Sequence, residues 1–452
     1  MEQLQQEEES HVQMLPEEVL ADVLRRLAPR SLAVSRGVCK AWLAAIDDHR
    51  LLRPELLPRS LGGMFIDFNI GCPKFFTRCS GGGAATAPTV GDLAYTSRPN
   101  RRVEDHCNGL LLRFQDVVNP ATRRWAPLPR PPPPRPRHMS KDQGFFAQQC
   151  LVYDPAVSPH HYEVFLMPFI AWWARLDDDA ATARSEWPPS PCETHVFSSR
   201  TGRWDERSFV REGEPAGTVA DAKRAAKTDK RYSVYWRGAL YVHSQNDFIC
   251  RVSLEDSKYQ VIKSPTENEP AEEHDYPDPY LGRSEKGVYC AILDRDFRRL
   301  RVWILDESSS SAGGVQMEWV LRHQCNSIHR VLFASRDSYQ RDDGARWCFQ
   351  DRHHYTNYPE ADHHRCAKTQ QYCSGGELKP VDDHHPYIAF LGLHPFKEIV
   401  YLGDMRSALA YDLNTSKVQY LGCIAGAEHE FIKTSFPYTP CGMDINSLRS
   451  ST

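Results

Sequence analysis

The sequence predicts an α+β multidomain protein, with a small N-terminal three-helix motif followed by a mainly β domain, arranged as a β-propeller. Apolar residues recur at helical spacing over residues 15–46, whereas short β-rich runs separated by turn residues fill the rest of the chain. Within the second region a unit of strand, polar turn and aromatic residue repeats, as in propeller blades. A β-sandwich is the alternative arrangement for the same strands.

These changes in pattern divide the 452 residues into four segments. Residues 1–11 form an acidic tail that we expect to be disordered, and residues 12–53 hold the helical motif. Residues 54–105 connect it to the β domain and supply its first strands. The β domain itself spans residues 106–445.

Composition is that of a soluble globular protein, with 41% hydrophobic and 25% charged residues. The net charge of −4 gives no electrostatic reason to expect a nucleic acid or a membrane as partner. The longest apolar run, residues 164–174, is too short to span a bilayer and is better explained as a buried strand. The N-terminus carries glutamates instead of the apolar run of a signal peptide, so we expect the fourteen cysteines to be reduced and the protein to lie in the cytoplasm, the nucleus or both.

The first helix of the motif is predicted to begin at Pro16, whose missing N–H is not needed in a first turn. One wide apolar stripe follows, formed by Val19, Leu20, Val23, Leu24 and Leu27. Pro29 ends this helix, Ser31 caps a short second one, and a third carries Val38, Trp42 and Ile46 at four-residue spacing.

Three such short helices cannot bury all of this apolar surface among themselves, since units below about 40 residues rarely fold without help. Either a partner or the neighbouring domain must cover the remainder. Periodicity alone leaves both alternatives open, the second being a helical cap on the β domain.

The order of landmarks along this segment closely resembles the F-box motif. The landmarks are Leu15-Pro16, Leu20, Leu24, Leu27, Ser31-Leu32, Arg36, Val38-Cys39-Lys40 and Trp42. The resemblance implies binding to the Skp adaptor, which links the F-box to a cullin scaffold. The segment departs from the family at Ala33 and Ser35, where bulkier residues are usual, and this predicts a weaker adaptor contact there.

We therefore predict an adaptor-binding set in which large apolar residues form the interface or support it. The set is Leu15, Pro16, Leu20, Leu24, Leu27, Leu32, Val38, Cys39 and Trp42. Leu20, Leu24 and Trp42 are the predicted anchors, because large apolar and aromatic residues dominate interface energetics.

The repeating unit of the β region occurs four times, each copy ending on an aromatic residue. The copies are residues 118–125, 197–204, 252–259 and 411–420. The interval from Trp319 to Tyr420 leaves room for another blade around Val331–Phe349, so the blade count stays open. Polar inserts at residues 211–230, 264–279 and 351–380 are predicted to be surface loops.

The phrases CNGLLLRF and VVNPATRRWAPLP, between Cys107 and Pro129, resemble the domain that follows the F-box in the large plant F-box family. In that family the domain is a kelch-like β-propeller. Together the two resemblances imply a non-catalytic substrate-receptor subunit of a Skp–cullin–F-box ubiquitin ligase, whose β domain captures an unknown protein target for ubiquitination. The alternative is a propeller that binds a small molecule or glycan, with an F-box that serves as a non-ligase anchor.

Several clusters invite a chemical interpretation, but none has the spacing of a known site. The His- and Cys-rich stretch over residues 353–385 has zinc-type ligands without a CxxC pair. Cys107 follows His106 directly, and adjacent residues rarely face each other, while Asn108-Gly109 is typical of a turn. Gly81–Gly83 lacks a strand–glycine–helix pattern, and Asp177–Asp179 lacks the turn of a calcium loop. We predict no catalytic residue, metal or cofactor.

The seven prolines of Pro127–Pro136 indicate a stiff inter-strand loop, or else a polyproline ligand.

Overall fold

The computed structural model describes most of the chain and groups it into two compact units. The described residues are 16–27, 32, 35, 38–49, 51, 61–68, 73–79, 90–99, 101–133, 145–171, 180–225, 232–244, 248–265, 279–294, 298–309, 315–334, 347–350, 388–404, 407–424, 432–443 and 445. The first unit ends at residue 60 and also takes in residues 154–159, and the second contains the remainder. The predicted tail, Gly81–Gly83, Asp177–Asp179 and residues 353–385 lie outside the described residues.

The first unit contains helices α2 (Glu17–Arg25) and α4 (Lys40–Asp48). Between them, Leu32 and Ser35 are also helical. Pro16 is the N-cap of α2 instead of lying in its first turn, and its carbonyl accepts the N–H of Leu20 at 3.0 Å. The apolar spacing thus predicted both flanking helices correctly.

The second unit is a series of four-stranded antiparallel sheets, which we call blades 1 to 6. Blade 1 contains β3 (Val103–Cys107), β4 (Leu110–Arg113), β5 (Asp116–Asn119) and β6 (Arg124–Pro127). Blade 2 contains β7 (Phe145–Val152), β8 (Glu163–Ile170), β10 (Cys192–Ser198) and β11 (Arg203–Glu212). Blade 3 contains β13 (Ser233–Trp236), β14 (Ala239–His243), β15 (Ile249–Ser253) and β16 (Lys258–Ile262). Blade 4 contains β17 (Tyr280–Ser284), β18 (Gly287–Leu293), β19 (Leu300–Ser309) and β20 (Val315–Cys325). Blade 5 contains β22 (Ala389–Leu393), β23 (Ile399–Gly403), β24 (Ser407–Asp412) and β25 (Val418–Cys423).

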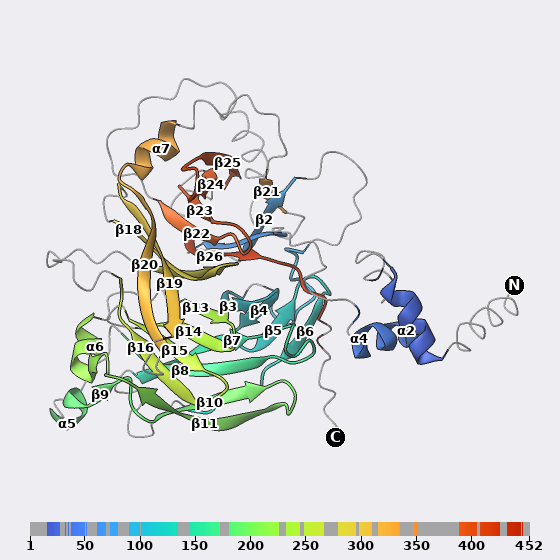
Figure 1. Cartoon of the computed structure of the whole chain (residues 1–452), viewed down its shortest axis with the longest axis horizontal. Helices are drawn as coiled ribbons and strands as arrows, with labels where there is room; N and C mark the ends of the chain where they lie inside the picture. The colour runs from blue at the N-terminus through green and yellow to red at the C-terminus, as the bar shows by residue number, and fades with distance from the viewer. Residues whose placement is uncertain are drawn as a thin grey trace, which may run out of the picture. The chain divides into compact units, whose positions relative to one another are not determined.

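Blade 6 is built from both ends of the β region. Its strands, from the innermost outward, are β26 (Ile432–Tyr438), β1 (Gly63–Phe68), β2 (Lys74–Arg78) and β21 (Trp347–Phe349). In Figure 1 the blue β2 and the red β26 therefore belong to one sheet. The prediction of a separate blade around Val331–Phe349 is wrong, because the described residues of that interval belong to helix α7 (Ile328–Ala334) and to β21, the outer strand of blade 6.

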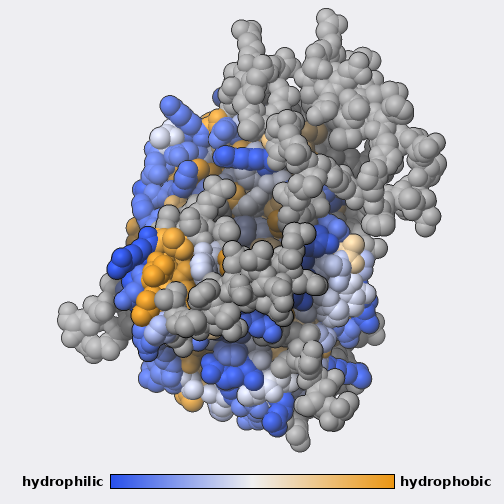
Figure 2. All heavy atoms as spheres, turned by 90° about the vertical axis from the view of Figure 1, so that its right-hand side faces the viewer, coloured by the Kyte–Doolittle hydropathy of each residue, from blue (hydrophilic) through white to orange (hydrophobic). Residues whose placement is uncertain are grey.

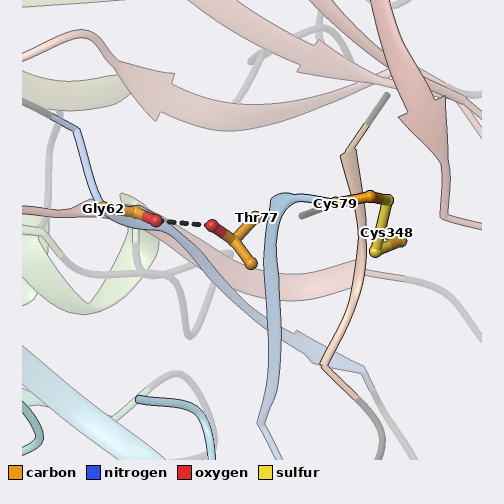
Figure 3. The surroundings of a disulfide bond; sticks show 4 residues. All are labelled: Gly62, Thr77, Cys79 and Cys348. Carbon is orange, nitrogen blue, oxygen red and sulfur yellow. Dashed lines mark hydrogen bonds between the residues drawn. A yellow bond between two sulfur atoms is a disulfide. The ribbon is translucent and has the colours of Figure 1, made fainter. Parts of the chain in front are cut away.

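The outer part of blade 6 is fastened by side chains. Thr77 donates a hydrogen bond from Oγ1 to the carbonyl of Gly62 at 2.6 Å, and Cys79 forms a disulfide with Cys348 (Figure 3). The prediction of reduced thiols is therefore wrong for this pair. Nine other described cysteines are not joined in disulfides.

Hydrophobic clusters fill the space between successive blades and close the ring. Separate clusters join blade 3 to 4, blade 4 to 5 and blade 5 to 6, and a large one spans blades 1 to 3. The cluster between blade 6 and blade 1 contains Phe65 and Phe436 on one side and Leu111 and Val118 on the other. Sheets that pack face to face in a closed circle form a β-propeller, here of six blades among the described residues.

The repeated turn unit is the hairpin between the third and fourth strands of a blade. It joins β5 to β6, β10 to β11, β15 to β16 and β24 to β25. Each turn holds one residue with positive φ, namely Arg123, Gly202, Ser257 and Ser416. The turn chemistry in the sequence thus predicted these four hairpins correctly.

The described part of the polar insert after blade 2, residues 211–225, forms regular structure, which corrects its prediction as a loop. β11 continues to Glu212, and β12 (Gly217–Thr218) and α6 (Val219–Ala225) follow. β12 pairs with β9 (Glu186–Trp187), which comes after α5 (Ala180–Arg184) and before β10 in the chain. Val219 and Ala222 are fully buried and belong to the large cluster that spans blades 1 to 3, so this insert packs onto the propeller. β11 also pairs in parallel with β16 and so joins blades 2 and 3. The predicted buried strand within residues 164–174 is β8.

The buried Asp105 ties three inner strands together near the centre of the ring. Its Oδ2 accepts hydrogen bonds from the N–H of Leu151 on β7 and the hydroxyl of Ser233 on β13, both at 2.6 Å. Burial raises the pKa of this carboxyl from 3.8 to about 7, although the hydrogen bonds oppose the rise. The folded chain therefore holds a proton here in a pH range where the unfolded chain has lost it.

We expect Asp105→Asn to flatten the dependence of stability on pH. Because the folded pKa is raised, the wild type loses stability as the pH rises from about 4 to about 7, by an amount on the order of 4 kcal/mol. The neutral amide retains the acceptor oxygen and has no such loss. Urea unfolding at pH 5 and pH 8 checks this: the stability of the variant relative to the wild type should be higher at pH 8 than at pH 5. Equal pH slopes for both proteins contradict the assignment.

Candidate functional site

The helical unit has a small core made from one face of each helix. From α2 it takes Leu20, Ala21 and Leu24, which are 4%, 1% and 0% exposed. From α4 it takes Ala45 and Ile46. Leu32 and Leu51 complete this core, and Leu27 and Trp42 pack against its rim.

The same unit leaves a second set of large apolar side chains in solvent. Val19 and Val23 are 44% and 50% exposed and lie four residues apart, hence on one face of α2. Val38, just before α4, is 61% exposed, and Leu43 of α4 is 36% exposed. Figure 2 shows one face of the chain, on which hydrophobic residues gather in a patch among hydrophilic ones. Exposed apolar side chains on a small helical unit are typical of a protein–protein contact.

Charged side chains flank this apolar face of α2. Glu18 and Asp22 are exposed, and Asp22 forms an ion pair with Arg25. Such an exposed pair contributes little to stability, about 0–1 kcal/mol. The face therefore has an apolar centre with a charged border, which is the usual anatomy of an interface.

The structure separates the predicted adaptor-binding residues into two groups. Leu20, Leu24 and Leu32 are buried in the core, and Leu27 and Trp42 are partly buried beside it. Pro16, Val38 and Cys39 are exposed, and Leu15 lies outside the described residues. The first group supports the fold of the unit, whereas the second is free to contact a partner.

Sequence reasoning did not choose Val19, Val23 and Leu43, although it placed the two valines in the apolar stripe. The stripe on α2 contains two pairs of adjacent apolar residues, Val19-Leu20 and Val23-Leu24, and adjacent residues lie about 100° apart around a helix. A stripe this wide covers two faces, one for the core and one for a partner. The width of the stripe was therefore the feature of the sequence that could have indicated the exposed valines.

The other sequence candidates in the propeller have structural contacts. Cys107 is buried, with Sγ 3.3 Å from the carbonyl oxygen of Tyr153. The His106 ring stacks on Phe436 with centroids 4.1 Å apart, so the two neighbours do face different ways. Asn108 and Gly109 have positive φ and form the predicted turn. Among the described residues no group of three or more His, Cys, Asp or Glu side chains could hold a metal ion.

The described part of the proline-rich segment connects β6 to β7. Trp204 donates a hydrogen bond from its indole N–H to the carbonyl of Pro129 at 3.1 Å, which fixes the segment against blade 2. The position of this segment agrees with the prediction of a stiff inter-strand loop. Residues 134–136 lie outside the described residues.

Comparison with known proteins gives a match for the helical unit and two distant structural neighbours. Residues 12–53 match the F-box-like family. The β-propeller domain of Myceliophteria thermophila Cps50 (Swd1) is 10% identical, with a TM-score of 0.32, covering 71% of this chain and 70% of that one. Citrobacter koseri AztD is 8% identical, with a TM-score of 0.28 and 74% of each chain covered. No curated protein matches the sequence.

None of the helices in the described residues has the length and apolar character needed to cross a membrane. The two units thus have distinct characters, one helical with a partly exposed apolar face and one a closed ring of sheets. The chain carries an F-box-like domain at residues 12–53, followed by a mainly β domain.

Proposed function

We propose that this chain is a non-catalytic substrate receptor of a Skp–cullin–F-box ubiquitin ligase. The F-box-like domain binds the Skp adaptor and, through it, the cullin. The propeller holds a protein target, so that target lysines stay close to the charged conjugating enzyme. Proximity of this kind raises the rate of transfer without any bond being made by the receptor itself.

The observation that carries this proposal is the exposed apolar face of the F-box-like domain. Val19, Val23, Val38 and Leu43 are too exposed to serve the core of their own unit. Fully burying an exposed side chain of this kind is worth about 1.5–3 kcal/mol. These four are about half exposed, so each can add about half of that, and together they still supply an anchor. Leu20 and Leu24 support this face from beneath, since both are buried in the same helix.

For the propeller, the motifs between Cys107 and Pro129 support a finer assignment. They form β4, β5, β6 and their turns, and they resemble the kelch-like associated domain of the plant F-box family. We propose that the propeller of this chain is a domain of that kind and captures the protein target. We also propose that the protein acts in the cytoplasm, the nucleus or both.

The test is co-purification with the Skp adaptor. Val19→Asp with Val23→Asp places two charges in the contact and is expected to lower adaptor recovery about 10- to 100-fold. Both side chains are exposed, so the helical unit should stay folded. Val210→Asp is the matched control, since this valine of β11 is 56% exposed in the propeller.

Full adaptor recovery by the folded double variant contradicts the proposed function. Circular dichroism separates this outcome from unfolding. The control variant should behave as the wild type does, because it alters an equally exposed apolar side chain away from the F-box-like domain.

A further inference from the structure

The inner strands of the propeller bring Arg283 and Asn108 together across the centre of the ring. Contacts between strands give the order β3, β7, β13, β17, β22 and β26, and the stacking of His106 on Phe436 closes the circle. Arg283 belongs to β17, which lies three strands from β3 in either direction. Its guanidinium nevertheless donates a hydrogen bond to Oδ1 of Asn108, directly after β3. The Arg283 side chain therefore crosses the axis of the propeller.

Among the described residues, this guanidinium has no acidic partner. Within the described part of the chain its only hydrogen-bond partner is the neutral amide of Asn108, and no ion pair includes it. By contrast, Arg322 forms an ion pair with Glu398, and Arg207 forms one with Glu163. A planar guanidinium with unused N–H groups fits a carboxylate through two parallel hydrogen bonds.

The neighbouring histidine adds no second charge. Burial and the nearby Arg283 lower the pKa of His106 to about 3, so its imidazole is neutral at physiological pH. The imidazole ring lies nearly parallel to the ring of Phe436, at 11°, which holds it in place. Asn108 is held in turn, because its Nδ2 donates to the carbonyl of Tyr153 at 2.6 Å.

Solvent reaches this part of the ring. Arg283, His106 and Asn108 are all partly exposed. Glu104, two residues before His106 on the same strand, is exposed although surrounding protein raises its pKa. Both properties are expected of a side chain that lines an internal passage. Arg101 lowers the pKa of Glu104 and partly offsets the effect of burial, and no ion pair among the described residues joins Glu104 to Arg283.

We propose that Arg283, with Asn108 and His106 beside it, forms a carboxylate-binding site on the axis of the propeller. The carboxylate belongs either to an acidic side chain of the captured target or to a free small acid. The first source deepens the proposed function and rests on it, whereas the second does not.

Isothermal titration of the full-length chain tests the site. The free-acid probe is benzoate, with the neutral benzamide as its control. The peptide probe is acetyl-Gly-Glu-Gly-amide, with the corresponding glutamine peptide as its control. Benzoate, the glutamate peptide or both should bind more tightly than their neutral controls. Arg283→Gln should weaken that binding about 10- to 100-fold, the range expected for a charged hydrogen-bonded pair.

A matched control and a second variant protect the test from folding effects. Arg203→Gln removes an exposed charge from β11 and should leave the affinity unchanged. Asn108→Asp places a carboxylate against Arg283 and should abolish binding; it decides the matter if Arg283→Gln does not fold. Binding of benzoate alone supports a free acid as the source, and binding of the glutamate peptide supports a target side chain.

The proposal is overturned if neither acid binds the wild type more tightly than its neutral control, or if a folded Arg283→Gln variant binds as well as the wild type. Its failure can be distinguished from that of the proposed function. Val19→Asp with Val23→Asp should leave carboxylate binding intact, and Arg283→Gln should leave adaptor recovery intact.

Discussion

Replacing Gly109 with alanine is expected to destabilise the propeller by about 3 kcal/mol or more, because two penalties add. Gly109 has φ of +91° in the turn between β3 and β4, a conformation that strains any residue with a Cβ. An added Cβ would also lie 2.5 Å from the carbonyl oxygen of Thr439 and 2.9 Å from the backbone nitrogen of Cys441. The C-terminal segment would have to move away from blade 1.

Gly238→Ala is the matched control for this prediction. Gly238 occupies the same place in the turn between β13 and β14, with φ of +77°, and its nearest neighbour is the flexible side chain of Glu255 at 3.5 Å. It should cost only the conformational strain, about 1–2 kcal/mol. Urea unfolding of the two variants measures the difference. Equal losses of stability would show that the contact with the C-terminal segment contributes nothing.

Replacing Asp116 with alanine is expected to cost about 3–5 kcal/mol, since it leaves a buried arginine without its partner. Arg113 and Asp116, at the turn between β4 and β5, are 1% and 4% exposed. Two hydrogen bonds of 2.6 Å join them, and Arg113 also donates to the carbonyl of Arg98 at 2.8 Å. Without the carboxylate, the buried charge of Arg113 has no counter-charge, and this lowers the free energy of unfolding.

Glu212→Ala is the comparison for this ion pair. The bridge between Glu212 and Lys258 is exposed on both sides, so its loss should cost far less stability than the loss of the buried pair. Adding Arg113→Met to Asp116→Ala should recover much of the stability, because both charges are then absent from the interior. If the double variant is as unstable as Asp116→Ala, the cost comes from packing instead of charge.

Local patterns in the sequence predicted the hairpins of the propeller because turn chemistry acts over a few residues. Asn108-Gly109 and the four turn units form where expected. The closure of the ring could not be predicted in this way. β26 and β21 join β1 and β2 from positions hundreds of residues away, and nothing in a three-residue strand such as Trp347–Phe349 indicates its distant partner.

The helical motif was predicted more completely, because amphipathic spacing and the order of landmarks both lie within one short segment. Periodicity could not separate Leu20 and Leu24 from Val19 and Val23, since all four are apolar and interleaved on α2. Only the packing of α2 against Ile46 and Leu32 decides which pair is the core.

Arg283 had no signal in the sequence. It is a single arginine in a strand with no motif around it, and its importance comes from facing Asn108, in a turn 175 residues away. Sites on a propeller axis collect one residue from each of several blades. Sequence reasoning finds such a set only when the blade register is already known.

Photocrosslinking tests the central claim, that the exposed face of the F-box-like domain binds the Skp adaptor. A photoreactive amino acid replaces Val23 in one protein and Val210 in another, and each is irradiated with purified adaptor. The account predicts an adaptor crosslink from position 23 and none from position 210. A crosslink from neither position, with both proteins folded, or from position 210 alone, would contradict it.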